Sequence, residues 1–330
     1  MKKVYLASVG ERSGKSVISL GLAMNCPGKV GFYKPFREIL TKGEGEVMDQ
    51  DALLMSEILH LEEGEKLSPF SYDIFDPIAM KDIVAGYEEL RKGKEFMIIE
   101  GSKDIANGCA HKLSHLDIAE ALDAPLILIS TSSHQSIDTV FIFKDLCDRR
   151  KLNMLGVILN RTEGGRERKF IENRGIKVLG EVPLMPELRT FKVSEMSEYM
   201  DAKVVAGAGG MNNVVETMLV GAMSTQTAIR YMRRSKRKAV ITGGDRTDIQ
   251  LAALSTDTSC IIVTGGIRPS YAVISRANQT NVPVLLTDED TLHVTETIEH
   301  LIARINPTDK EKIELVRKKV RLNVDLDKIW

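Results

Sequence analysis

The start of the chain combines three features that strongly constrain what it can fold into. An apolar run at residues 4–7 predicts a buried strand, and residues 17–22 have the composition of a helix. The loop between them ends in Gly14-Lys15-Ser16. A helix that begins directly after such a loop presents its first backbone N–H groups to an anion. In this context a lysine reaches the β- and γ-phosphates and a serine hydroxyl holds Mg²⁺, so we expect the N-terminal half to bind a nucleoside triphosphate.

The loop departs from the standard phosphate-binding pattern at one position. That pattern has a glycine five residues before its second glycine, whereas this chain has Val9 there and Gly10 next to it. Three interpretations stay open: a variant loop that binds Mg-ATP, a decayed loop in a scaffold, and a plain strand-to-helix turn with a solvated lysine. If the loop is functional, the residues around the phosphates are Gly10, Glu11, Arg12, Ser13, Gly14, Lys15, Ser16 and Val17.

The composition limits the class of protein. A chain of 330 residues is expected to form one large or two ordinary domains. A net charge of −1 gives no overall field that favours nucleic acid or an anionic membrane. There is no apolar run of 18 residues, and the first apolar stretch is too short for a signal peptide, so we expect no membrane segment. Four cysteines without Cys-x-x-Cys spacing indicate reduced core thiols in a cytoplasmic protein: Cys26, Cys109, Cys147 and Cys260.

The first half of the chain alternates short apolar runs with helical patterns. This alternation predicts a parallel sheet covered by helices on both faces. Ligands of such sheets lie beyond the carboxyl ends of the strands, where both Gly14-Lys15-Ser16 and Glu100 fall. The predicted strands are 29–33, 96–100, 125–130, 155–160 and 177–179, and the predicted helices are 51–59, 116–122 and 139–150.

The second half contains a short motif that occurs twice. The run Thr242-Gly243-Gly244-Asp245-Arg246 and the run Thr264-Gly265-Gly266-Ile267-Arg268 each follow an apolar strand and precede a helical pattern. Each could form an anion cradle at a helix start, in which case the glycines and arginines line a pocket for a phosphate-bearing metabolite or a nucleotide. The alternative is that the glycines only make tight turns. The residues of this second anion site are Gly243, Gly244, Arg246, Gly265, Gly266 and Arg268.

Three other patterns favour structural interpretations. Thr308 and Glu311 have the spacing of a capping box, which predicts an exposed C-terminal helix to about residue 320. The basic run at 230–238 is explained by cations at a helix end, so nucleic acid is not expected as a partner. His111 and His115 lack the glutamate of zinc proteases and are expected to be solvated.

With these motifs in place, the chain resembles a two-part arrangement. Residues 1–187 resemble the dethiobiotin synthetase-like P-loop domain, and residues 188–305 resemble the DRTGG domain, with a helix and tail at 306–330. The resemblance implies an α/β fold in which a P-loop NTPase-like parallel sheet precedes a smaller α/β domain. Together the two parts resemble the N-terminal, non-catalytic portion of long phosphotransacetylases. The chain stops at Trp330 without a catalytic domain of that family, so the resemblance argues against acetyl transfer.

The first resemblance assigns roles to particular residues. It implies that Lys34 of Tyr33-Lys34-Pro35 faces substrate and phosphate, so that Lys15 and Lys34 are the catalytic candidates. It also implies that Asp51 and Glu100 bind Mg²⁺, and these carboxylates with the Ser16 hydroxyl form the hard oxygen set that Mg²⁺ prefers. The residues expected beside adenine are Asn160, Arg161 and Pro183.

Each assignment has a structural alternative. Glu100 can serve a strand-end salt bridge, Asp51 can favour a helix dipole, Lys34 can be a surface lysine and Asn160 a turn residue. The chain also departs from the synthetase where that enzyme contacts its diamino-acid substrate. Phe36-Arg37-Glu38 and Ser102-Lys103-Asp104 replace small residues there, so dethiobiotin synthesis itself is not expected.

The sequence therefore predicts a cytoplasmic two-domain protein that binds ATP and Mg²⁺. We expect a regulatory or sensing role, with the second domain as a regulatory or dimer-forming module that takes an unknown small-molecule ligand. By family association this role is linked to acyl-CoA or acetyl-phosphate metabolism. The alternatives are an ATP-dependent ligase that activates a carboxylate or carbamate, and a scaffold with a decayed P-loop.

Overall fold

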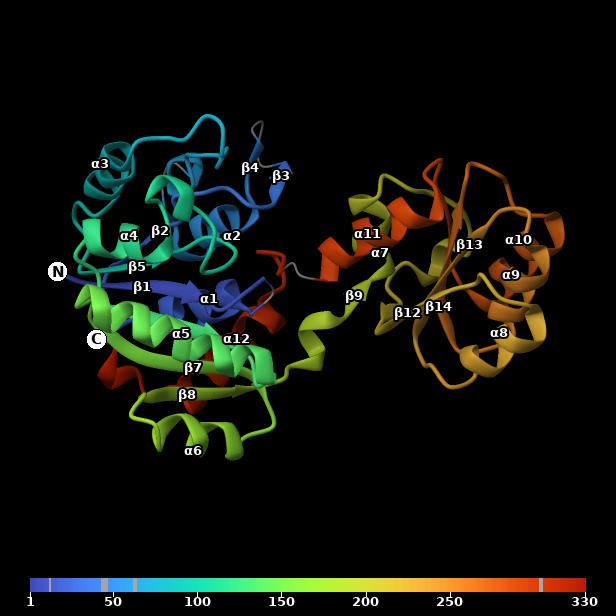
Figure 1. Cartoon of the computed structure of the whole chain (residues 1–330). Coiled ribbons are helices and arrows are strands. Elements are labelled where there is room, and N and C mark those ends of the chain that lie inside the picture. Colours follow the sequence, from blue (N-terminus) through green and yellow to red (C-terminus); the bar gives the residue numbers. More distant parts are fainter. Residues whose placement is uncertain (12, 43–46, 62–63, 303–304) are drawn as a thin grey trace. The chain divides into compact units, whose positions relative to one another are not determined.

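The computed structural model describes residues 1–330 except 12, 43–46, 62–63 and 303–304. The chain divides into two compact units, Met1–Met185 with Ile305–Trp330 and Pro186–Arg304. Both chain ends therefore belong to the first unit (Figure 1). The second unit is inserted between the main part of the first unit and its last segment.

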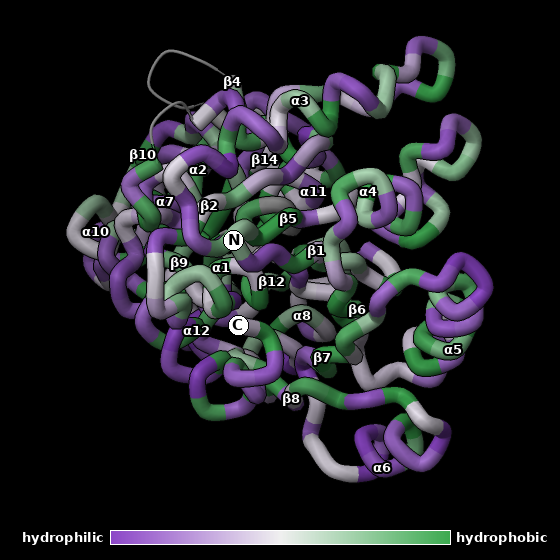
Figure 2. Tube along the Cα trace, turned by 90° about the vertical axis from the view of Figure 1, so that its left-hand side faces the viewer, coloured by the Kyte–Doolittle hydropathy of each residue, from purple (hydrophilic) through white to green (hydrophobic). Residues whose placement is uncertain are grey.

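The first unit is built on a parallel six-stranded sheet in the order β2-β5-β1-β6-β7-β8. Its strands are almost entirely apolar because both faces of the sheet are covered. In Figure 2 the central strands β6 and β7 are coloured as hydrophobic, whereas α6 is largely hydrophilic. The strands are β1 (Lys2–Ser8), β2 (Val30–Tyr33), β5 (Phe96–Glu100), β6 (Leu126–Ser130), β7 (Met154–Thr162) and β8 (Val178–Pro183).

Helices cover both faces of this sheet. One face packs against α3 (Met80–Leu90), α4 (His115–Ala121), α5 (His134–Arg150) and α6 (Arg166–Glu172). On the other side α1 (Lys15–Asn25) contacts β1 and β5, and α12 (Lys310–Asn323) contacts β8 and α1. A hairpin of β3 (Leu40–Lys42) and β4 (Val47–Asp49) leads into α2 (Gln50–Leu59). The predicted fold class of this half is confirmed.

The C-terminal helix differs from its prediction in two respects. Its N-cap is Asp309, whose side chain accepts a hydrogen bond from the Lys312 amide, and not Thr308. The expectation of an exposed helix is also wrong, because Ile313, Val316 and Val320 are buried. These residues recur at helical spacing and form an apolar stripe on an otherwise charged helix. Residues 305–330 thus pack as part of the first unit.

The second unit has a five-stranded sheet in the order β10-β15-β14-β13-β12, with β10 antiparallel at one edge. One face packs against α8 (Thr225–Met232), α9 (Thr247–Leu254) and α10 (Tyr271–Thr280), and the other against α7 (Val193–Tyr199) and α11 (Thr291–Ile302). A short ladder joins β9 (Phe191–Lys192) to β11 (Val214–Val215). The sheet strands are β10 (Lys203–Ala206), β12 (Thr217–Val220), β13 (Lys238–Gly243), β14 (Thr258–Thr264) and β15 (Val284–Leu286).

Candidate functional site

The loop between β1 and α1 has the form of a phosphate-binding loop. Gly14, the residue before α1, has a left-handed φ of 86°, and a Cβ there would lie 2.0 Å from Asn160 Nδ2. Asn160 donates a 2.9 Å hydrogen bond to the carbonyl oxygen of Ser13, and Ser13 Oγ donates to the carbonyl of Gly10 at 2.6 Å. Glycine is therefore required at position 14 by both backbone conformation and space. Arg12, a predicted phosphate contact, lies outside the described residues.

The first turn of α1 presents positive potential. Among the described residues no side chain caps this turn, and no acidic residue lies in it. Its first N–H groups and the helix dipole therefore favour an anion. Lys15 is 92% buried at the same place, and its Nζ lies 3.4 Å from Ser8 Oγ. A phosphate group bound here would meet backbone N–H groups and an ammonium together.

The three predicted Mg²⁺ ligands converge beside this turn. Ser16 Oγ donates to Glu100 Oε1 at 3.3 Å and also hydrogen-bonds to Asp51. Ser19, one turn further along α1, donates to the other oxygen of Glu100 at 2.5 Å. The described residues contain no group of three or more His, Cys, Asp or Glu side chains that could hold a metal by themselves. A Mg²⁺ ion on Ser16, Asp51 and Glu100 would therefore complete its shell with phosphate and water oxygens, as Mg²⁺ commonly does.

Lys34 lies in a carboxylate cage that sequence reasoning did not find. Its Nζ is 2.6 Å from Asp51 Oδ2, 3.1 Å from Asp49 Oδ2 and 3.4 Å from Glu38 Oε2. Burial lowers the pKa of Lys34, but the carboxylates of Asp51 and Asp49 outweigh it and raise that pKa well above its usual value. Lys34 is thus a permanent cation that holds Asp51 in place. Its charge is already balanced in the absence of substrate.

Asp49 and Glu38 are the two members of this cage that the sequence interpretation did not single out. Asp49 is completely buried, caps α2 by accepting from the amides of Asp51 and Ala52, and also accepts from the Glu38 amide. The sequence does carry an indication for Asp49, because aspartate is favoured as the N-cap residue just before a helix. Glu38 gave no comparable signal, because its role depends on a chain reversal between β2 and α2.

Glu100 carries a pKa shift with a consequence for stability. Burial, then the nearby charge of Asp51, raises its pKa to about 7, against the opposing effects of Lys34, Lys15 and Ser19. A carboxyl whose pKa is higher in the folded than in the unfolded state stabilises the fold at low pH and loses that contribution as pH rises through the folded-state value. The apo protein should therefore lose stability between about pH 4.5 and pH 7 through this group.

Glu100→Gln is expected to remove that loss. The variant should be more stable than the wild type at pH 8 by about 2–3 kcal/mol and similar to it at pH 4.5, because glutamine does not ionise. Urea unfolding of the ligand-free proteins at both pH values measures this difference. Glu57→Gln, at an exposed position on α2, is the matched control. Parallel pH profiles for the wild type and Glu100→Gln would contradict the assignment.

The residues predicted to lie beside adenine are brought to one edge of the sheet. Asn160 and Arg161 end β7, and the neighbouring residue Thr162 pairs with Pro183 at the end of β8. The amide nitrogen of Asn160 donates to the P-loop, and Arg161 has a left-handed backbone with φ of 57°. Asn160 thus has a structural role in the loop, and its contact with adenine stays a prediction.

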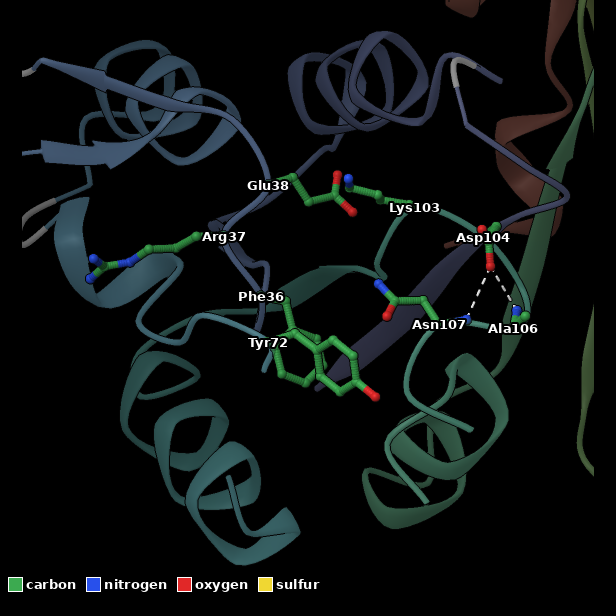
Figure 3. A pocket seen from close by; sticks show the side chains of 8 residues that line it. All are labelled: Phe36, Arg37, Glu38, Tyr72, Lys103, Asp104, Ala106 and Asn107. Carbon is green, nitrogen blue, oxygen red and sulfur yellow. Dashed lines mark hydrogen bonds between the residues drawn. The ribbon is translucent and has the colours of Figure 1, made fainter. Parts of the chain in front are cut away.

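A cavity of about 530 Å³ is lined in part by Glu38, a member of the carboxylate cage (Figure 3). Phe36 and Tyr72 form one wall in an edge-to-face pair with ring centroids 5.6 Å apart. Glu38, two residues after Phe36, also lines it, and Lys103 and Asn107 line it from the segment after β5. Arg37 points away and donates from Nε to the carbonyl of Ser68. Glu38 Oε1 is buried and has no hydrogen-bond partner in the part of the chain that the structure describes. Phe36-Arg37-Glu38 and Ser102-Lys103-Asp104, the two segments that depart from the synthetase pattern, therefore both contribute residues to this cavity.

The twin loops of the second unit are closely packed against each other and against the segment that follows β15. A Cβ on Gly244 would lie 1.9 Å from the carbonyl oxygen of Ile267. The amides of Gly265 and Gly266 donate to the carbonyls of Glu289 and Thr287, and the Arg246 amide donates to the Gly243 carbonyl. The Arg246 side chain pairs with Asp248 at 3.1 Å. These bonds favour the tight-turn interpretation, and an anion bound by Arg246 or Arg268 stays a prediction.

Two minor interpretations need correction. His115 is not solvated but completely buried, and His111 is only partly exposed, with its Nε2 2.7 Å from the carbonyl oxygen of Ile74. All four cysteines are free, as expected, but only Cys147 and Cys260 are buried, and Cys109 is exposed.

In the basic run at 230–238, Lys238 is buried at the start of β13 and donates to the Asp257 and Ser235 carbonyls. No helix among the described residues has the length and apolarity needed to cross a bilayer.

A parallel sheet with a Gly-Lys-Ser loop and converging carboxylates defines a P-loop nucleotide-binding protein of the ATPase-like class. The chain belongs to the AAA domain family, which matches residues 2–192, and the DRTGG domain matches residues 195–301. The resemblance inferred from the motifs is confirmed.

The proteins similar to this chain include two enzymes, matched by sequence, and a solved ATPase structure. A phosphate acetyltransferase of Nitratidesulfovibrio vulgaris is 25% identical over 94% of this chain and 48% of its own length. An ATP-dependent dethiobiotin synthetase of Brachyspira hyodysenteriae is 25% identical over 54% of this chain and 90% of its own. A crystal structure of a ParA family ATPase from Chlorobium tepidum has a TM-score of 0.39 and 16% identity over 57% of this chain and 87% of its own. The chain thus spans about half the length of the phosphate acetyltransferase that it matches.

Proposed function

We propose that the first unit binds Mg-ATP and that the protein is a nucleotide-dependent regulator or sensor. The observation that carries this proposal is the convergence of Lys15, Ser16, Asp51 and Glu100 at the uncapped start of α1. Lys15 and the first amides would bind the β- and γ-phosphates, and the three oxygen ligands would hold Mg²⁺. Adenine would lie toward Asn160, Arg161 and Pro183.

The proposed role of the second unit is regulatory or dimer-forming. Its match to the DRTGG domain supports a unit distinct from the nucleotide site, and the phosphate acetyltransferase relative supports a link to acyl-CoA or acetyl-phosphate metabolism. Acetyl transfer itself is not part of this proposal. Free thiols at all four cysteines fit a cytoplasmic location.

Calorimetric titration of the full chain with ATP tests the nucleotide site, once with Mg²⁺ and once with EDTA. We expect saturable heat in both titrations and a higher affinity for ATP when Mg²⁺ is present. Flat titrations in both conditions would leave the decayed-loop scaffold as the better account. ATP that stays intact during hours of incubation would favour a sensor over an enzyme.

A second candidate function is an ATP-dependent ligase, and the cavity beside Lys34 favours it. Its volume lies within the range of small-molecule sites, and the buried unpartnered oxygen of Glu38 offers an acceptor to a second substrate. In a ligase, Lys15 would neutralise charge on the transferring phosphoryl group, and Lys34, whose charge the carboxylate cage already balances, would act by holding Asp51 in place.

The ligase predicts turnover that depends on the cavity. With Mg-ATP, bicarbonate and a mixture of small amines and carboxylates, ADP should form, and Asn107→Ala should reduce its rate about tenfold or more. Because Asn107 lies in the cavity and away from the P-loop cluster, the variant should keep its affinity for Mg-ATP. Coupled detection of ADP measures both proteins. No ADP above the protein-free rate would reject the ligase and leave the sensor.

A further inference from the structure

A buried polar pair lies behind the end of strand β5. Tyr5 on β1 and His115 at the start of α4 are both completely buried. Tyr5 Oη and His115 Nδ1 form a 3.1 Å hydrogen bond, and the two rings meet edge to face with centroids 5.7 Å apart. Polar groups in an apolar core lower stability unless they are hydrogen-bonded, and His115 Nε2 has no partner within the described chain. Two apolar residues would fill this space at lower cost, so the pair requires an explanation.

The pair touches the residue that follows Glu100. A Cβ on Gly101 would lie 2.2 Å from His115 Nδ1 and 2.5 Å from Tyr5 Oη. Gly101 also donates from its amide to the Leu6 carbonyl at 2.9 Å. Its φ is not in the left-handed region, so glycine is needed here for space and not for backbone freedom. The peptide after Glu100 is therefore held between β1 and the Tyr5–His115 hydrogen bond.

Strand alternation connects this contact to the metal-binding position. Tyr5 pairs with Ile99 across β1 and β5, and both side chains face the core covered by α3 and α4. Gly101 lies two residues after Ile99 and so falls on the same face, whereas Glu100 points to the opposite face. There it meets Ser16 and Ser19 of α1. A shift of the Gly101 peptide would therefore move the Glu100 carboxylate relative to α1.

The charge state of the pair suits this task. Burial, with a smaller effect of the nearby Lys15 charge, lowers the pKa of His115 to about 3. The imidazole is therefore neutral near pH 7. It supports the strand end without adding a positive charge that would oppose a metal ion.

We propose that Tyr5 and His115 are positioning residues that hold the Glu100 carboxylate in place to bind Mg²⁺. The inference rests on the proposed function, because it requires Mg²⁺ to bind with ATP at Ser16, Asp51 and Glu100. Residues that orient metal ligands alter metal affinity when they are changed, by about 10–100-fold in typical cases. They leave the direct phosphate contacts of the loop unchanged.

The experiment separates Mg²⁺ affinity from nucleotide affinity in the full chain. ATP binding is measured by calorimetry in EDTA and then at increasing Mg²⁺, for the wild type, Tyr5→Phe, His115→Leu and His115→Asn. Tyr5→Phe and His115→Leu should raise the half-saturating Mg²⁺ concentration about tenfold and change the affinity in EDTA less than twofold. His115→Asn should stay within about threefold of the wild type, because the asparagine amide carries a polar atom where Nδ1 stood.

Tyr33→Phe is the matched control. Tyr33 is another completely buried tyrosine of the same core, and its hydroxyl donates to the Ile83 carbonyl on α3 at 3.0 Å. Thermal unfolding of each variant shows which of them fold. If Tyr5→Phe does not fold, the comparison of His115→Leu with His115→Asn decides.

The outcomes distinguish two failures. A wild type that binds no ATP refutes the proposed function. A wild type that binds Mg-ATP, with Tyr5→Phe and His115→Leu showing the same Mg²⁺ dependence as Tyr33→Phe, refutes the positioning role alone.

Discussion

Replacing Lys15 by alanine is expected to lower the affinity for Mg-ATP about a hundredfold and to leave the fold intact. Removing one partner of a desolvated charge pair typically costs 2–5 kcal/mol, and about 3 kcal/mol corresponds to a factor of about a hundred. Lys15 is largely buried at the first turn of α1, where a phosphate would be shielded from water. Its removal takes away the 3.4 Å contact with Ser8 Oγ and a charge that favours the ionised forms of Asp51 and Glu100, so some stability should be lost at neutral pH without unfolding the protein.

The matched control for Lys15→Ala is Lys29→Ala. Lys29 is exposed just before β2, at the amino end of the parallel strands, and carries the same charge. Calorimetry should show wild-type affinity for Lys29→Ala and strongly reduced binding for Lys15→Ala. Equal affinity in all three proteins would mean that ATP binds elsewhere, and the P-loop proposal would then fail.

The framework of this protein could be predicted because its central strands are buried on both faces. Such strands appear in the sequence as continuous apolar runs, and residues 96–100 correspond to β5 without any shift. The carboxyl ends of parallel strands meet at one edge, which is why Ser16 and Glu100 could be placed together before their distance was known. Residues 214–220, by contrast, form two short strands, β11 and β12, on either side of Glu216.

The interior of the site could not be predicted in the same way. The cage around Lys34 depends on where the β3–β4 hairpin returns the chain, and that hairpin lacks a strong apolar pattern. A lysine before a proline looks like a surface residue until the three carboxylates of Glu38, Asp49 and Asp51 are placed around it. His115 was predicted to be solvated because its partner Tyr5 lies 110 positions away in sequence.

The C-terminal helix was predicted to be exposed because its charged composition was given more weight than the spacing of its apolar residues. Its lysines and arginines indicate a solvated surface, yet Ile313, Val316 and Val320 recur at helical spacing on one face. That face packs on α1, where a Cβ on Gly21 would lie 2.2 Å from Val320 Cγ2. Asn25 of α1 also donates to the Arg317 carbonyl at 2.9 Å. The segment after α12 also packs on the first unit. Val324 forms an isolated β-bridge with Gly180 of β8, and the ring of Trp330 contacts Phe96 edge to face.

Val320→Asp is therefore expected to destabilise the whole nucleotide-binding unit. An uncompensated carboxylate in this apolar contact should cost about 3–5 kcal/mol. A domain of this kind is stable by only about 5–15 kcal/mol, so the variant should be close to unfolding at 25 °C. Because α1 carries the P-loop at its first turn, ATP affinity should fall together with stability.

Leu322→Asp tests whether the effect belongs to the contact and not to the charge. Leu322 lies on the same helix with 69% of its surface exposed, so the same substitution there should change the free energy of unfolding by less than about 0.5 kcal/mol. Urea unfolding measures both variants, and calorimetry with Mg-ATP measures the site. If Val320→Asp were as stable as Leu322→Asp, then α12 would not support α1 in solution, and residues 305–330 could be removed without loss of nucleotide binding. If instead Val320→Asp unfolds, a fragment that ends at residue 187 should also fail to bind ATP, because it lacks the helix that packs on α1.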